Sequence, residues 1–170
     1  SHVLGNGVNV SLFQGHEVRQ RKRLVYTSTP FRGLELLPRL FKEILTKHAD
    51  AELHVFSGMD VYRGAGPDTN RQFEAIYAAV RATPRCTLHG SVLQSVLARE
   101  LMRSSILAYP NTFEETSCIA ALEAQAAGCV PITSQRAGLI ETVGDRGILI
   151  PGDPTSAAYQ SQFIGAVDHL

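Results

Sequence analysis

The chain has 170 residues and no net charge, with 16 Lys and Arg side chains against 16 Asp and Glu side chains. This length allows one domain, or at most one and a half, and a hydrophobic fraction of 44% supplies a sizeable core. The charge balance excludes a nucleic-acid protein driven by bulk basicity and an acidic disordered tail.

The shortness of the apolar runs and the spacing of the cysteines favour a cytoplasmic protein. No apolar run approaches the ~20 residues that cross a bilayer, and the N-terminal SHVLGNGVNV lacks the pattern of a signal peptide. Cys86, Cys118 and Cys129 form no CxxC pair, so we expect reduced thiols, no zinc site and no disulfide framework. Because an initiator Met is missing, we expect a processed chain or a fragment of a longer one.

Residues 1–22 are interpreted as an incoming linker or arm, because they are rich in Gly and show no helical period. Their end carries a short basic cluster without interleaved aromatic residues, which favours a solvated linker over a nucleic-acid patch. The cluster consists of Arg19, Arg21, Lys22 and Arg23.

From Arg23 onward, short β-rich runs alternate with longer amphipathic stretches. The predicted strands are 24–27, 53–57, 87–89, 106–109, 130–133 and 148–150. Apolar residues at helical spacing predict helices around 34–45, 73–80 and 93–101, and an Ala-rich helix that Ser117 caps and Gly128 ends. This alternation predicts a doubly wound α/β domain over 23–170, with a Rossmann-like parallel sheet of about six strands and helices on both faces.

The residues that follow each strand are the candidates for chemistry, since ligands of such sheets bind at the carboxyl ends of the strands. The first strand is followed by STPFRGLELL rather than by GxGxxG, and no GxxxxGK[ST] occurs. An ordinary dehydrogenase and a P-loop NTPase are therefore disfavoured. We expect His54 and His89, which lie in or at the end of predicted strands, to be structural.

The segment 109–134, YPNTFEETSCIAALEAQAAGCVPITS, is the most informative part of the chain. Two carboxylates, Glu114 and Glu115, precede a predicted helix N-terminus, whose free N–H groups suit a phosphate or diphosphate. If the helix is continuous, Glu123 lies about 12 Å from Glu115 along its axis and on roughly the same side. A carboxylate there matches the two hydroxyls of a ribose. The plainer alternative is a dipole-favoured Glu115 and a solvated Glu123.

This segment closely resembles the E-x7-E region of retaining GT-B glycosyltransferases of the glycosyltransferase family 4, or group 1, type. The usual sequence of these enzymes in this region is close to P-S-x-x-E-x-F-G-x-x-x-L-E-A-M-A-x-G-x-P-V-V. The arm Asn6-Gly7-Val8-Asn9 with Phe13 looks like the linker that enters the family's C-terminal domain, and further matches lie at 137–141 and 147–153. The central matches are Pro110, Glu115, Leu122, Glu123, Ala124, Gly128 and Pro131.

The resemblance implies a nucleotide-sugar donor domain, one half of a GT-B fold whose N-terminal acceptor domain is absent from this sequence. The whole enzyme would transfer a hexosyl group from a UDP- or GDP-sugar to a glycan, lipid or other acceptor, with retention and without a metal or other cofactor. Polysaccharide biosynthesis in the cytoplasm is the implied role, with membrane association only peripheral and through the missing domain. The fragment alone would bind nucleotide, no nucleic acid, and be inactive.

The same match implies the site residues. Arg32 would neutralise the leaving diphosphate, Glu115 would contact the sugar or its neighbouring phosphate, and Glu123 would hold the ribose. The amides of 116–118 would cradle the diphosphate. The loop at Gly90 would approach the nucleotide, with the base near Val92 and Leu93. The implied donor-binding residues besides Glu123 are Ser28, Gly33, Gly58, Gly90, Val92, Leu93, Thr116, Ser117 and Cys118.

The sequence also departs from the family pattern. The basic residue that often follows the first strand is absent, because Tyr26-Thr27-Ser28 stands there, and Ser28 or Thr29 is a substitute hydrogen-bond donor for a phosphate. Two alternatives therefore stay open: a non-catalytic nucleotide-sugar-binding or assembly module, and a sugar-nucleotide epimerase of GT-B architecture.

Overall fold

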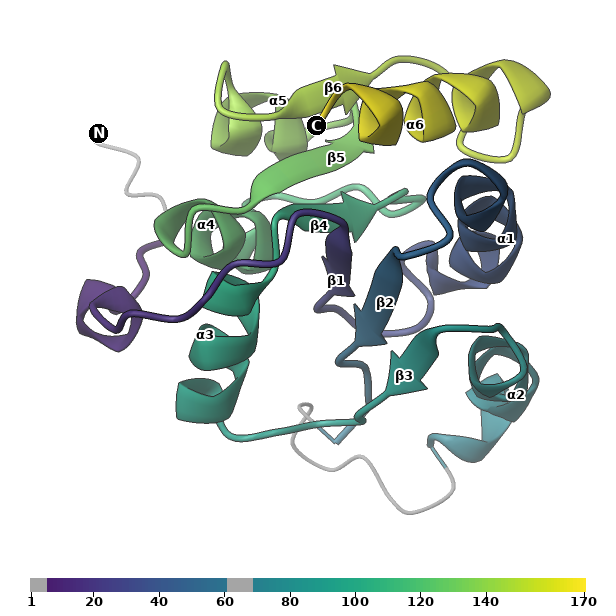
Figure 1. Ribbon diagram of the computed structural model, residues 1–170. Helices are drawn as coiled ribbons and strands as arrows, with labels where there is room; N and C mark the ends of the chain where they lie inside the picture. The colour runs from purple at the N-terminus through teal and green to yellow at the C-terminus, as the bar shows by residue number, and fades with distance from the viewer. Residues whose placement is uncertain (1–5, 61–68) are drawn as a thin grey trace.

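The computed structural model describes residues 6–60 and 69–170, which form a parallel sheet between two layers of helices (Figure 1). The order of its six strands is β3-β2-β1-β4-β5-β6, and every neighbouring pair is parallel. The predicted doubly wound α/β fold is thus confirmed. The strands are β1 (Arg23–Tyr26), β2 (Glu52–Val55), β3 (Cys86–Leu88), β4 (Ile106–Tyr109), β5 (Val130–Ser134) and β6 (Ile148–Ile150).

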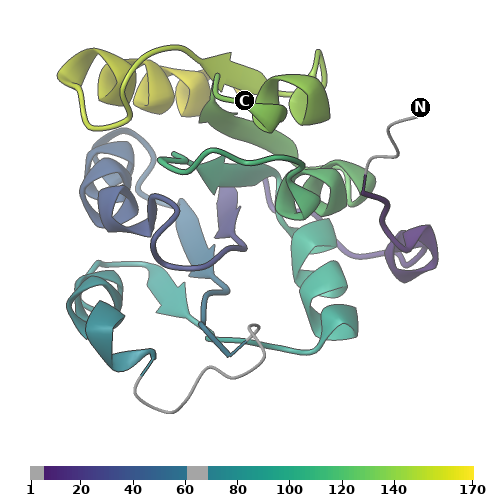
Figure 2. The ribbon, with the colours of Figure 1, turned by 180° about the vertical axis from the view of Figure 1, so that it is seen from behind.

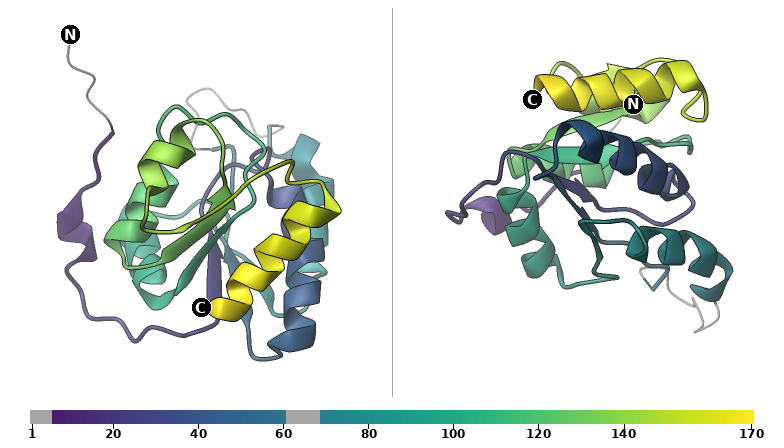
Figure 3. Two further views of the ribbon diagram at one scale, coloured as in Figure 1. Left: turned by 90° about the horizontal axis from the view of Figure 1, so that it is seen from above. Right: turned by 45° about the vertical axis from the view of Figure 1, so that its right-hand side comes forward.

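Three helices cover each face of the sheet, as the front and back views show (Figures 1 and 2). One face carries α1 (Leu37–Lys47), α2 (Glu74–Arg81) and α6 (Ala157–His169), and α6 packs along α1 (Figure 3). The other face carries α3 (Gln94–Arg103), α4 (Ile119–Ala126) and α5 (Gly138–Val143). Short 3-10 helices lie at η1 (Val10–Phe13), η2 (Leu34–Leu36) and η3 (Arg71–Phe73). None of the helices in 6–60 and 69–170 is both long and apolar enough to cross a membrane.

The two central strands, β1 and β4, are buried along their whole length. Their apolar runs LVY and ILAY are continuous rather than alternating, because helices cover both faces of the sheet. Leu24 pairs with Ile106 and Val25 pairs with Leu107. The order of the strands reverses between β1 and β4, so a crevice is expected at their carboxyl ends.

The helix in the E-x7-E segment starts later than predicted. Cys118 is the N-cap of α4 and makes no side-chain cap, so the prediction that Ser117 caps this helix is wrong. The carbonyl oxygen of Glu115 instead accepts a hydrogen bond of 2.8 Å from the N–H of Gly138, which ties the loop between β4 and α4 to the start of α5. Glu115 therefore precedes the helix that carries Glu123, and the continuous-helix geometry is also wrong. The predicted end is confirmed, since Gly128 follows the last turn with φ +81°.

The basic cluster at the end of the arm makes hydrogen bonds to the domain, although Arg19 and Arg21 remain exposed. Arg19 donates to the carbonyl oxygens of Ala127 (2.5 Å) and Ser104, and the Lys22 ammonium donates to that of Val167 (2.7 Å). Carbonyls at helix C-termini lack intrahelical partners and attract cations, which explains the difference from the prediction. Residues 6–22 run beside α3 and α4, with η1 against α3 (Figure 2), and residues 1–5 of the predicted arm lie outside the described part.

Candidate functional site

A cavity of about 500 Å³ opens at the carboxyl ends of the central strands. Its walls come from the loops after β1, β2, β3 and β4 and from the first turns of α4. This is the crevice that the reversal of strand order creates. Its lining residues are Thr27, Ser28, Thr29, Arg32, Phe56, Gly58, Gly90, Ser91, Val92, Gln94, Leu97, Glu115, Thr116, Ser117, Cys118, Ile119, Ala120 and Glu123.

Most of the residues singled out in the sequence lie in this one lining, although they come from distant parts of the chain. Two do not. Leu93 is the N-cap of α3 and is 75% exposed. Gly33 has φ +101°, and a Cβ atom there would clash with the carbonyl oxygen of Pro110. A glycine is therefore needed where the loop after β1 packs against the loop after β4. The predicted residues in the lining are Ser28, Arg32, Gly58, Gly90, Val92, Glu115, Thr116, Ser117, Cys118 and Glu123.

The lining of the cavity includes a buried carboxylate with two hydrogen-bond donors. Glu115 is 6% exposed, and its Oε1 accepts hydrogen bonds from Arg32 Nη1 at 2.7 Å and from the Tyr109 hydroxyl at 2.6 Å. The Arg32 guanidinium also lies over the Phe113 ring, 4.8 Å from its centroid. Burial raises the pKa of Tyr109, which keeps its hydroxyl protonated as a donor. Sequence reasoning missed Tyr109, because a Tyr that ends an apolar strand looks like a core residue.

Hydroxyl groups form the wall next to this pair. Ser28 Oγ lies 3.4 Å from the Tyr109 hydroxyl. The Oγ1 atoms of Thr27 and Thr29 are buried and have no hydrogen-bond partner within the protein. Buried polar atoms are rarely left unpaired, so hydroxyls in a cavity wall are suited to a ligand.

Glu123, on α4, faces the far side of the same cavity. The side-chain amide of Gln94, at the start of α3, donates to Glu123 Oε1. Burial raises the pKa of Glu123, and the Gln94 hydrogen bond acts in the opposite direction. Gln94 was not predicted, because an exposed polar residue in a first helical turn gives no signal of its own.

The apolar side chains of the lining include Phe56, Val92 and Leu97. His89 lies one layer behind the lining, since its ring stacks on Phe56 at a centroid distance of 4.3 Å and does not line the cavity. His89 Nε2 lies 2.9 Å from His54 Nδ1 on β2, which in turn contacts Arg23. Burial lowers the pKa of both imidazoles.

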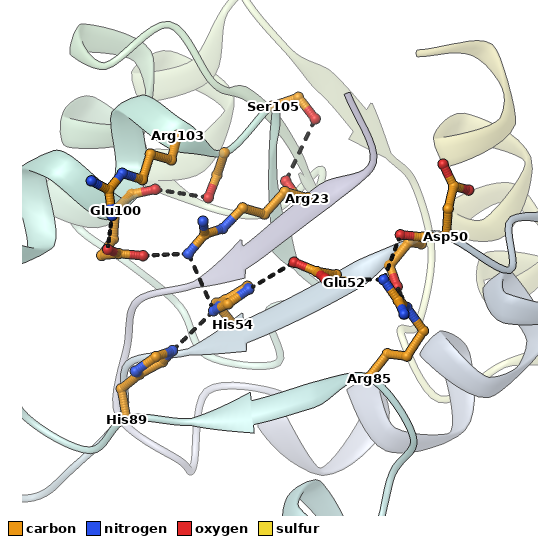
Figure 4. A network of polar contacts seen from close by, with 11 residues as sticks. Arg23, Asp50, Glu52, His54, Arg85, His89, Glu100, Arg103 and Ser105 are labelled. Carbon is orange, nitrogen blue, oxygen red and sulfur yellow. Dashed lines mark hydrogen bonds and ion pairs between the residues drawn. The ribbon is translucent and has the colours of Figure 1, made fainter. Parts of the chain in front are cut away.

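Figure 4 shows that these histidines belong to a polar network that joins β1, β2 and α3. Arg23 pairs with Glu100 of α3, and Glu100 also accepts from Arg103 at 3.1 Å. Glu52 accepts from Arg85 at 3.0 Å. The prediction that His54 is a sheet residue is confirmed.

Within 6–60 and 69–170, no group of three or more His, Cys, Asp or Glu residues is arranged to hold a metal ion. The three cysteines are free. Burial raises the pKa of Cys118, which lines the cavity, to about 11.

Solved structures share this fold over almost the whole chain. They include sucrose-phosphate synthase from Thermosynechococcus elongatus (TM-score 0.69, 21% identity), a glycosyltransferase from Rickettsia africae (0.68, 16%) and Anabaena Alr3699/HepE in complex with UDP-glucose (0.67, 15%). The matches cover 96%, 96% and 95% of this chain but only 41%, 45% and 49% of those chains. The chain therefore spans less than half the length of these proteins.

The comparison with curated proteins gave no match. The sequence itself matches the family model described as glycosyl transferases group 1 over residues 21–164. Because this match extends well beyond half of the 170 residues, the protein belongs to the glycosyl transferases group 1 family.

Proposed function

We propose that this chain is the donor-binding domain of a retaining GT-B glycosyltransferase, and that its cavity binds a nucleotide-diphospho-sugar. One observation carries the proposal: a single cavity gathers Arg32, Glu115, the backbone before α4 and Glu123 from separate segments. Its volume of about 500 Å³ lies in the ~300–1,000 Å³ range of small-molecule sites.

The diphosphate would lie between Arg32 and the N-terminus of α4. The N–H groups of the first helical turn have no intrahelical acceptor, and the helix dipole favours an anion there. Thr116, Ser117 and Cys118 line the cavity beside that turn. Arg32 would stabilise the charge that develops on the leaving diphosphate.

The nucleoside would occupy the remaining walls. Glu123 would accept two hydrogen bonds from a ribose diol. The base would lie between the apolar side chains of Phe56, Val92 and Leu97 and the backbone of Gly58 and Gly90.

The acceptor would be held by a part of a longer protein, since the chain spans less than half of its structural relatives. In the transfer, the bond between the anomeric carbon and the diphosphate oxygen breaks, and the acceptor oxygen bonds to the same face of that carbon and loses its proton. The proposed substrates are a UDP- or GDP-hexose and a glycan, lipid or other acceptor in cytoplasmic polysaccharide biosynthesis. The proposal includes no metal: Arg32 and the helix amides would be the groups that contact the diphosphate.

Calorimetric titration of this chain with UDP, GDP, ADP and TDP tests the donor site, with millimolar ligand included. Glu123→Ala should weaken binding of the preferred diphosphate by about 1–3 kcal/mol, because two hydrogen bonds to a charged group are lost. Glu114→Ala is the matched control, since the neighbouring Glu114 is exposed and lies outside the lining. Equal effects of the two substitutions, or no nucleotide binding at all, would contradict the proposal.

One observation favours the non-catalytic alternative. In the part of the chain that the structure describes, Arg32 is the single cation that lines the cavity. A binding module would bind a nucleotide-sugar without consuming it. Turnover of the donor by the longer protein in the presence of acceptor would exclude this alternative.

A further inference from the structure

The positive charge of Arg32 is compensated by a carboxylate of the protein itself. Arg32 Nη1 lies 2.7 Å from Glu115 Oε1, and this carboxylate is 6% exposed. The Tyr109 hydroxyl, which belongs to a fully buried side chain, binds the same oxygen at 2.6 Å. Glu115 is therefore held beside Arg32 from two directions.

The charged lining as a whole is negative in the described residues. One guanidinium, Arg32, faces two carboxylates, Glu115 and Glu123. Cys118 is a neutral thiol at pH 7, because burial raises its pKa to about 11. The loop after β1 adds neutral hydroxyls, at Thr27, Ser28 and Thr29, where a second cation would otherwise strengthen anion binding.

The two forms of the proposed ligand differ in charge at the end that meets Glu115. In a nucleotide-diphospho-sugar each phosphate carries one negative charge, whereas the terminal phosphate of a free nucleoside diphosphate carries about −1.5 to −2 at pH 7. A sugar hydroxyl can donate a hydrogen bond to the Glu115 carboxylate, but a bare terminal phosphate offers it only like charge.

We propose that the Arg32–Glu115 pair makes this cavity select the nucleotide-diphospho-sugar over the nucleoside diphosphate that remains after transfer. The inference rests on the proposed function and deepens it. Glu115 attracts the hydroxyls of the donor sugar and competes with a bare diphosphate for Arg32. After transfer the same carboxylate repels the product, so the product leaves readily and inhibits weakly.

The test compares three ligands of the preferred base by calorimetry: the diphospho-sugar, the free diphosphate, and the diphosphate with a methyl ester on its terminal phosphate. The methyl ester removes the extra charge without adding a sugar. The unaltered chain should bind the diphospho-sugar best, the methyl ester next and the free diphosphate least. Glu115→Gln should strengthen binding of the free diphosphate by about tenfold, the effect of removing one close like charge at a partly screened site. The same substitution should strengthen binding of the methyl ester less.

Glu114→Gln is the matched control, because it removes the same charge at the next position, outside the cavity lining. It should leave all three affinities unchanged. If the free diphosphate binds tightest to the unaltered chain and Glu115→Gln weakens or does not change its binding, the inference is wrong, while the loss caused by Glu123→Ala still supports the donor site. If no ligand binds, the proposed function fails and this inference fails with it. If Glu115→Gln does not fold, the order of the three affinities for the unaltered chain tests the inference: tightest binding of the free diphosphate would contradict it.

Discussion

Glu115 and Glu123 owe their orientation to side chains from other elements of the fold. Arg32 and Tyr109 hold Glu115, and Gln94 holds Glu123. A carboxylate that must bind a ligand gains from such support, because the cost of fixing its rotamer is met on folding rather than on binding. The seven-residue interval between the two glutamates therefore describes the site less well than the contacts that each of them makes.

Gly33 illustrates how strictly a single position beside the site is determined. Its φ of +101° strains any L side chain, and a Cβ would also clash with the Pro110 carbonyl oxygen. Gly152 provides the matched comparison, because its φ is +98° and nothing lies within 4 Å of a Cβ there. We expect Gly152→Ala to lower the free energy of unfolding by about 1–2 kcal/mol through backbone strain alone. Gly33→Ala should cost about 1–3 kcal/mol more, because a contact between two loops must also open.

Urea denaturation of the two variants beside the unaltered chain measures this difference. Equal shifts of the two midpoints would mean that the approach of Gly33 to Pro110 is not tight. In that case the loop with Arg32 would be free to move relative to the loop with Glu115.

Among the elements, the arm and two helix ends are joined through one side chain. Arg19 donates to the carbonyl oxygens of Ser104, the C-cap of α3, and Ala127, the C-cap of α4. Both helices point their negative ends at this guanidinium, and both contribute residues to the cavity at their other ends. The arm thus fixes the pair of helices on which Gln94 and Glu123 stand.

Arg19→Met should lower the free energy of unfolding by about 1–2 kcal/mol, because two hydrogen bonds between a charged donor and helix-end carbonyls are lost. It should also speed amide hydrogen exchange in residues 6–20. Arg21→Met is the matched control, since Arg21 is exposed like Arg19 but its one hydrogen bond, to the Leu170 carbonyl oxygen, is 3.5 Å long. A loss for Arg21→Met as large as that for Arg19→Met would refute the assignment.

For the molecule as a whole, burial of the histidine pair makes stability depend on pH. His54 is surrounded by Arg23 of β1, Glu52 of β2 and His89, and Glu100 of α3 lies nearby. Burial is the main cause that lowers the pKa of both imidazoles, and the charge of Arg23 adds to it. The unfolded chain therefore binds more protons than the folded chain at pH values below about 6.5.

It follows that the pair stabilises the folded state fully above about pH 6.5, and that the free energy of unfolding falls as the pH drops from there toward the lowered pKa values of the pair. We expect urea midpoints to decrease from about pH 7.5 to about pH 5.5, and the decrease to be smaller in His54→Asn. The comparison uses the change with pH rather than the absolute midpoint, because the substitution also removes contacts. His16→Asn, at an exposed position, should keep the full decrease. An identical decrease in His54→Asn would contradict the role of this pair.

The sequence by itself determined the fold class, the six strands within one or two residues, and most of the cavity lining. It could do so because buried parallel strands require continuous apolar runs, helices require a 3.6-residue period, and ligand groups gather after the strands. Sequence reasoning failed where contacts between distant segments decide the outcome. The start of α4 depends on the hydrogen bond between Glu115 and Gly138, and the basic arm is held by carbonyls at the ends of α3, α4 and α6.

Tertiary structure alone also decided that Tyr109 and Arg32 share one oxygen of Glu115, and that Gln94 reaches Glu123. A Tyr in an apolar strand and a Gln in a first helical turn are compatible with many environments. These side chains meet their partners only when the sheet forms and brings the loops after its strands together. Local sequence patterns predict helices and strands because the interactions that form these elements are largely local. The charge balance of the cavity depends instead on side chains from segments that meet only in the folded molecule.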